Sequence, residues 1–123
     1  MPSTRNKADV EYAVMLAVLN FQKEFMQSRY SLIQVRLLEN LLEVDLTRTA
    51  PSPAERRLAQ TQEGRDQLRK MYQALFTAGH DILKEQLEEL LAGTIYEMVT
   101  DLDPLSGKST LVIGFNEAIS NSA

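Results

Sequence analysis

The chain has 123 residues, no cysteine and a formal net charge of −4. The lack of cysteine excludes a disulfide framework and a thiolate metal site, and the acidic balance argues against a nucleic-acid partner. Hydrophobic residues make up 44% of the chain, yet no stretch approaches the roughly 20 apolar residues that span a bilayer, so we expect one soluble, cytoplasmic domain over residues 1–123.

A first helix is predicted from about Lys7 to Gln27, with Asn6 as its N-cap. Apolar residues recur in this segment at spacings of three and four, which indicates a helix with one buried face. That face comprises Val10, Val14, Ala17, Val18, Phe21 and Phe25.

Two strands follow and form the clearest hairpin of the sequence, because apolar and polar residues alternate on both sides of a turn at residues 39–40. In this register Leu37 faces Leu42 on the apolar side, and Arg36 faces Glu43 on the polar side. A shift of one residue would turn the charged side chains toward the core, so the pattern fixes the register.

A short helix is predicted from Pro53 to about Gln60. Ser52 precedes the proline, and Glu55 follows three residues after Ser52, which is the pattern of a capping box with proline at the first helical position. The start of this helix is therefore strongly specified by local sequence.

A long helix is predicted from about Gln62 to Ala92, with Thr61 as its N-cap and Gly93 as a left-handed residue at its end. At 1.5 Å per residue it would be about 45 Å long, more than the width of a domain of this size. Either the helix bends near Gly79, or part of its apolar stripe packs on a second chain. We favour the second alternative and expect a homodimer.

The last two strands are predicted from Thr94 to Leu102 and from Ser109 to Phe115, joined by a polar turn. Their core face is expected to carry Ile95, Val99, Leu111, Ile113 and Phe115. The order of elements predicts an α+β, two-layer fold in which the N-terminal, short and long helices cover a four-stranded antiparallel sheet. The pattern leaves open whether the two hairpins join in one sheet. The last residues of the tail, beyond Glu117, are expected to fray.

The groups needed for catalysis or metal binding do not converge in the sequence. The single histidine, His80, lies within the long helix beside Asp81, and adjacent helical residues are not expected to face each other. HExxH and phosphate-loop motifs are absent. We therefore expect neither an enzyme nor a bound cofactor or metal.

Acidic residues gather in two places. Glu85, Glu88 and Glu89 have the spacing of a solvated helix face. Asp101 and Asp103 lie on one side of a strand end, where two carboxylates could hold a hard cation or simply cap the turn.

The start of the long helix is a candidate anion-binding site. A helix N-terminus offers free N–H groups and a partial positive charge. Thr61, Gly64 and Arg65 lie there, and the glycine would allow close approach of a ligand. The alternative is that Gly64 serves tight packing of the two helices.

A basic segment adjoins this position and is a candidate docking surface. Residues 48–70 carry six basic and three acidic side chains, whereas the chain as a whole is acidic. Arg56, Arg57 and Arg69 are the residues expected to contact a partner. The alternative is an ordinary solvated surface with internal ion pairs.

The stretch from Pro51 onward resembles the signature of the MpsC-like family, small proteins long described as a domain of unknown function. The resemblance extends over about residues 8–116, and Asp101 and Gly107 occupy the places of the family's strand-end aspartate and turn glycine. The family commonly has a Gly-Pro loop where this chain has residues 27–30. The signature is matched by Ser52, Pro53, Ala54, Glu55, Leu58, Ala59, Glu63, Gly64 and Arg65.

The resemblance implies association with a sodium-translocating, membrane-potential-generating system linked to bicarbonate uptake. Family members are soluble accessories without an assigned reaction, so no catalytic residues carry over. We therefore expect a non-enzymatic, dimeric accessory protein that docks on a membrane transport protein, peripheral to the inner face of the membrane. The alternative is a module that senses a small anion at residues 61–65.

Overall fold

The computed structural model describes residues 6–26, 30–48 and 52–117, so the tail that was predicted to fray and the first three residues of the 27–30 loop lie outside the described residues. No helix among the described residues is long and apolar enough to cross a membrane. The elements are α1 (Lys7–Asn20), η1 (Phe21–Met26), β1 (Tyr30–Leu38), β2 (Leu41–Arg48), α2 (Pro53–Leu58), α3 (Gln62–Leu91), β3 (Ile95–Asp103) and β4 (Lys108–Phe115).

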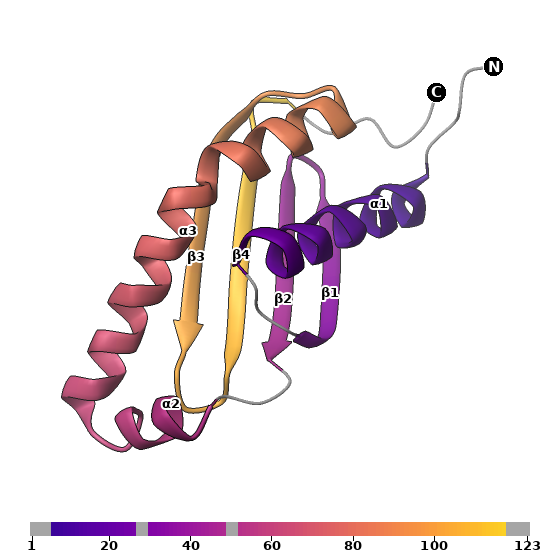
Figure 1. Cartoon of the computed structure of the whole chain (residues 1–123). Helices are drawn as coiled ribbons and strands as arrows, with labels where there is room; N and C mark the ends of the chain where they lie inside the picture. The colour runs from indigo at the N-terminus through magenta and orange to yellow at the C-terminus, as the bar shows by residue number, and fades with distance from the viewer. Residues whose placement is uncertain (1–5, 27–29, 49–51, 118–123) are drawn as a thin grey trace.

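The two hairpins join in one four-stranded antiparallel sheet with the strand order β1-β2-β4-β3. In Figure 1, α1 crosses the sheet near β1 and β2, while α3 runs beside β3. The α+β fold with an N-terminal, a short and a long helix is confirmed.

The register predicted for the first hairpin is confirmed. Leu37 pairs with Leu42 and Arg36 pairs with Glu43, and the last two side chains form an ion pair. The turn is anchored to the far end of the chain, because the Asn40 side chain donates a hydrogen bond of 2.9 Å to the Phe115 carbonyl. This bond helps hold the turn of the first hairpin against the end of β4.

Strand β3 departs from the predicted core face. Its register shifts between Ile95 and Glu97, and this β-bulge places Val99 on the uncovered face, with 49% of its surface exposed. The prediction that Val99 belongs to the core is therefore wrong, because one extra residue reverses the alternation. On the same face a methyl group at Gly114 would lie 2.7 Å from the Tyr96 ring, so the missing side chain makes room for that ring.

The first helix is not α-helical to its predicted end. Its Asn6 cap is confirmed and forms a capping box with Asp9, but beyond Asn20 the chain continues as the π-helix η1. Hydrogen bonding to the fifth residue widens this turn and changes which side chains point inward. As a result Met26 is buried, whereas Phe25, predicted in the core, is 40% exposed and stacks on Phe21.

Helix α3 is continuous over 30 residues, and its axis curves along the sheet in Figure 1. The curvature lets one stripe of the helix stay in contact with the core over most of its length. This buried stripe comprises Gly64, Leu68, Tyr72, Phe76, Gly79, Leu83 and Leu87.

The end of α3 corrects the predicted cap. Ala92, not Gly93, takes the left-handed conformation, with φ of 52°, and the Gly93 N–H bonds to the Glu88 carbonyl. This is the arrangement of a Schellman motif with alanine where glycine is usual. Glycine follows it for a steric reason, because a methyl group at Gly93 would lie 3.1 Å from Cδ1 of Phe115.

Replacing Ala92 with glycine is expected to stabilise the protein by about 0.5 to 1 kcal/mol, because glycine adopts the left-handed conformation without a steric penalty. Urea denaturation of both proteins measures the difference. The adjacent Gly93→Ala variant is the control and should be less stable than wild type. A less stable Ala92→Gly protein would contradict this description of the helix end.

Side chains of α3 bind backbone groups of β3, which is an edge strand of the sheet. These bonds run from Arg69 Nε to the Leu102 carbonyl (3.3 Å), from Gln73 Nε2 to the Thr100 carbonyl (2.6 Å), and from the Ile95 N–H to the Glu88 carboxylate (2.8 Å). The helix therefore satisfies these three backbone groups of the edge strand.

Candidate functional site

The signature residues gather at one end of the sheet, where β2 ends, α2 and the start of α3 lie, and β3 turns into β4 (Figure 1). Gly107 lies in that turn with φ of +74°, a conformation that favours glycine. Its carbonyl accepts a hydrogen bond of 3.1 Å from the Arg48 N–H, which ties the β3–β4 turn to the end of β2. We call this region the signature end.

An ion pair holds α2 to the sheet at the signature end. The capping box of Ser52 and Glu55 is confirmed, with Pro53 in the first turn. The Glu55 carboxylate also accepts two hydrogen bonds from the Arg48 guanidinium, of 2.5 and 3.3 Å. Hydrogen bonding to Arg48 holds the pKa of Glu55 below its usual value, against the opposing effect of partial burial.

The Glu55→Gln variant is expected to be about 1 to 2 kcal/mol less stable than wild type at pH 7, because a charge-assisted, bidentate contact is lost. The folded-state pKa of Glu55 is lowered, so its contribution is complete above the unfolded value of about 4.5 and disappears as pH falls through the folded value. In thermal melts between pH 3 and 7, the melting temperatures of the two proteins should therefore converge at the acidic end.

The exposed Glu97, changed to glutamine, provides the control for this pH series. The free energy of unfolding of this Glu97→Gln protein should differ from that of wild type by no more than about 0.5 kcal/mol at pH 7. A constant gap between wild type and Glu55→Gln at every pH would show that the charge of Glu55 contributes nothing.

Gly64 is buried in the contact between the two helices. A methyl group at this position would lie 1.8 Å from the carbonyl oxygen of Leu58, at the end of α2. The glycine thus lets the backbones of α2 and α3 approach closely. Of the two alternatives raised by the sequence, the structure supports packing as a reason for the glycine.

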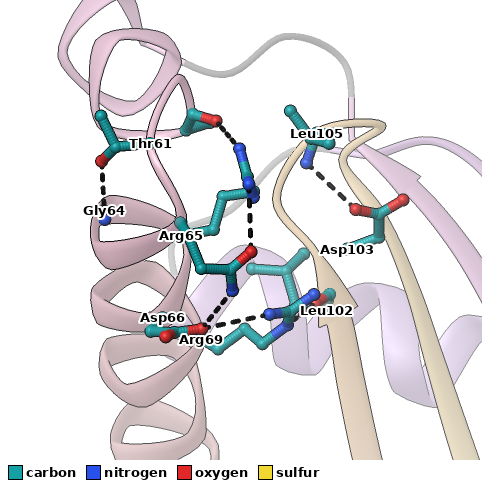
Figure 2. Close-up of polar contacts among 10 residues, drawn as sticks. Thr61, Gly64, Arg65, Asp66, Arg69, Leu102, Asp103 and Leu105 are labelled. Atoms are coloured by element: carbon teal, nitrogen blue, oxygen red, sulfur yellow. Dashed lines mark hydrogen bonds and ion pairs between the residues drawn. The ribbon is translucent and has the colours of Figure 1, made fainter.

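The polar groups predicted to bind an anion already have partners within the protein, as Figure 2 shows. Thr61 Oγ1 accepts a hydrogen bond of 3.0 Å from the Gly64 N–H. The Arg65 guanidinium donates to the Ala59 carbonyl at 2.8 Å and to the Gln62 side chain at 3.1 Å. An anion would have to compete with these contacts, and the anion-binding hypothesis remains an untested prediction.

The three arginines predicted to contact a partner differ in their surroundings. Arg56 and Arg57 are exposed on α2. Arg69 is partly exposed, but its guanidinium group bonds to the Leu102 carbonyl and lies 3.5 Å from the Asp66 carboxylate (Figure 2). The structure therefore leaves Arg56 and Arg57 better placed than Arg69 to meet another molecule.

The acidic residues at the strand end behave as a turn cap. Asp103 accepts hydrogen bonds from the Ser106 hydroxyl (2.8 Å) and from the Leu105 N–H (3.1 Å), and these bonds lower its pKa. The side chain of Asp101 is exposed. No group of three or more His, Cys, Asp or Glu side chains suited to a metal occurs within residues 6–26, 30–48 and 52–117.

His80 corrects one prediction, because its Nδ1 lies 3.3 Å from the Asp81 carboxylate although the residues are adjacent on the helix. Its ring also packs edge-on against Phe76, with ring centres 6.1 Å apart. The contact is at the surface, since the Asp81 side chain is fully exposed.

Two features of the structure, one at the signature end and one farther along α3, were not predicted from the sequence. Arg48 was counted only as part of a basic segment, and its contact with Glu55 depends on how β2 ends. A hollow of about 260 Å³ also lies between η1 and α3. This hollow is lined by Asn20, Phe21, Glu24, Phe25, Ile82 and Gln86.

Comparison with known proteins gives one match. Residues 6–117, nearly the whole chain, match a family described as "Na+-translocating membrane potential-generating system (MpsC)". No curated protein and no solved structure matches the chain significantly. The matched range includes every residue of the signature end.

Proposed function

Because this chain belongs to the MpsC family, we propose that it is a non-enzymatic accessory protein of a Na+-translocating, membrane-potential-generating system. It acts as a dimer, by docking on a membrane protein of that system at the inner face of the membrane. The inorganic-carbon link implied by the family resemblance makes bicarbonate transport the process that it serves.

The docking part of this proposal rests on the two exposed arginines of α2. Arg56 and Arg57 lie next to each other on a short helix that Arg48 and Glu55 hold in place. Their guanidinium groups suit carboxylates on a protein surface, because each presents several donors in a planar fork. Two exposed cations on a protein with a net charge of −4 would attract an acidic partner and orient it.

The test uses membranes from the organism that encodes the chain. We expect the Arg56→Gln/Arg57→Gln protein to bind these membranes less than wild type, and the remaining binding to depend less on NaCl concentration. Binding is measured by co-sedimentation, and the bound partner is identified by cross-linking.

A matched control removes two positive charges elsewhere, at the exposed Lys7 and Lys23, with both changed to glutamine. This variant should bind as wild type does. Equal binding of all three proteins would exclude α2 as the docking surface. Neutralising Arg65 would be less informative, since its guanidinium group also holds the start of α3.

A further inference from the structure

Helix α3 carries a second apolar stripe that the core does not cover. Met71, Leu75 and Ile82 have 49%, 45% and 43% of their surfaces exposed, and Ala78 between them is exposed as well. Their successive spacings of four, three and four are those of a seam between two packed helices. This exposed stripe is distinct from the buried stripe that faces the sheet.

The charges beside the exposed stripe are arranged asymmetrically along the helix. Lys70 lies toward its N-terminal end, and Asp81 and Glu85 lie toward its C-terminal end; all three are exposed. Two parallel copies would keep Lys70 level with Lys70 of the other copy and far from its acidic pair, so these groups would gain no attraction. Two antiparallel copies would place Lys70 of each chain across from the acidic pair of the other.

We propose that the exposed stripe binds a second copy of this chain, with the two α3 helices antiparallel and a twofold axis passing between Leu75 and Ala78. Met71 and Ile82 are equally far from this axis. Met71 of one chain therefore contacts Ile82 of the partner subunit, and the same contact recurs on the other side. The inference specifies the dimer of the proposed function.

The hollow beside Ile82 fits this arrangement. It lies between η1 and α3, and Phe25 and Ile82 are among its lining residues. Met71 of the opposing chain would arrive at its mouth, and the flexible, unbranched methionine side chain adapts well to an irregular apolar site. The stripe of each copy thus supplies both a projecting side chain and the hollow that receives it.

The absence of cysteine allows a direct test by disulfide formation. Met71→Cys and Ile82→Cys proteins are mixed, oxidised mildly and separated on non-reducing gels. The antiparallel dimer should give the mixed disulfide in large excess over either homodisulfide. In this geometry two copies of position 71 are offset by about 16 Å along the helices, too far for a disulfide.

Sedimentation equilibrium supplies a second measurement. Wild type should dimerise, Lys70→Glu should dimerise at least tenfold more weakly, and Lys70→Glu/Asp81→Lys/Glu85→Lys should recover most of the loss. A dominant Met71→Cys homodisulfide, or a wild-type monomer at all concentrations, would overturn the proposal. Membrane binding through Arg56 and Arg57 is measured separately, so docking and dimer geometry can fail independently.

Discussion

Replacing Gly64 with alanine is expected to lower the melting temperature by roughly 10 °C, corresponding to a loss of about 2 to 3 kcal/mol. The new methyl group would lie 1.8 Å from the Leu58 carbonyl oxygen, which belongs to backbone and cannot turn aside. Helix α2 must therefore move away from α3. This cost exceeds the gain of about 1 kcal/mol that alanine brings to a helix interior.

Gly79, on the same helix, is the matched control for this substitution. A methyl group there would also be too close to its neighbours, at 2.4 Å from Phe25 Cε2 and 2.8 Å from Phe21 Cζ. These are side-chain atoms, and the partly exposed Phe25 ring has room to turn. The Gly79→Ala protein should thus lose less stability than Gly64→Ala, and the reverse order would contradict the helix contact described here.

Replacing Leu83 with alanine is expected to destabilise the protein by about 2 to 5 kcal/mol, because it leaves a cavity that the core closes only in part. Leu83 is fully buried in the stripe of α3 that faces the sheet. Small domains have total stabilities of roughly 5 to 15 kcal/mol, so this loss would be a large fraction. Urea denaturation followed by circular dichroism measures it.

The exposed Leu105, in the turn between β3 and β4, provides a control for the same chemical change. Leu105→Ala should alter stability by no more than about 0.5 kcal/mol. Equal effects of the two substitutions would mean that α3 does not pack on the sheet through Leu83.

Local sequence patterns correctly predicted elements in which the apolar face and the polar face both indicate the same register. The hairpin register followed from Leu37 opposite Leu42 and Arg36 opposite Glu43, and both pairs are present. Val99 was placed wrongly because the register of β3 shifts between Ile95 and Glu97, where the Tyr96 ring lies against Gly114 in another strand. A contact between distant residues of this kind leaves no signal in the alternation of β3 itself.

Helix ends and turns show the same difference: those formed within one short segment were predicted, and those that depend on distant residues were not. Ser52 and Glu55 form the predicted cap because all its atoms come from one short segment. The cap at Ala92 was placed one residue too late, since Gly93 is required by its contact with Phe115 rather than by its own conformation. The π-helical turn was not predicted; Phe21 and Phe25 stack within it, and both rings lie close to Gly79 of α3.

The sequence indicated which basic residues belong to the candidate site, but not which of their side chains are exposed. A basic segment was expected at residues 48–70, and the structure places its arginines at the end of β2, on α2 and near the start of α3. Arg65 and Arg69 bond to backbone carbonyls within the chain, whereas Arg56 and Arg57 remain exposed. This difference in exposure between the two pairs of arginines arises from the packing of α2 and α3 in the fold, which the sequence alone does not show.

The hydrogen bonds from α3 to the outer backbone of β3 have a consequence for how this protein can aggregate. Arg69, Gln73 and Glu88 occupy polar groups that would otherwise accept an additional strand. An amyloid fibril lengthens only when each subunit can pair at both sides. Because its own helix engages these three groups, the β3 edge offers fewer free polar groups to an added strand than an uncovered edge would.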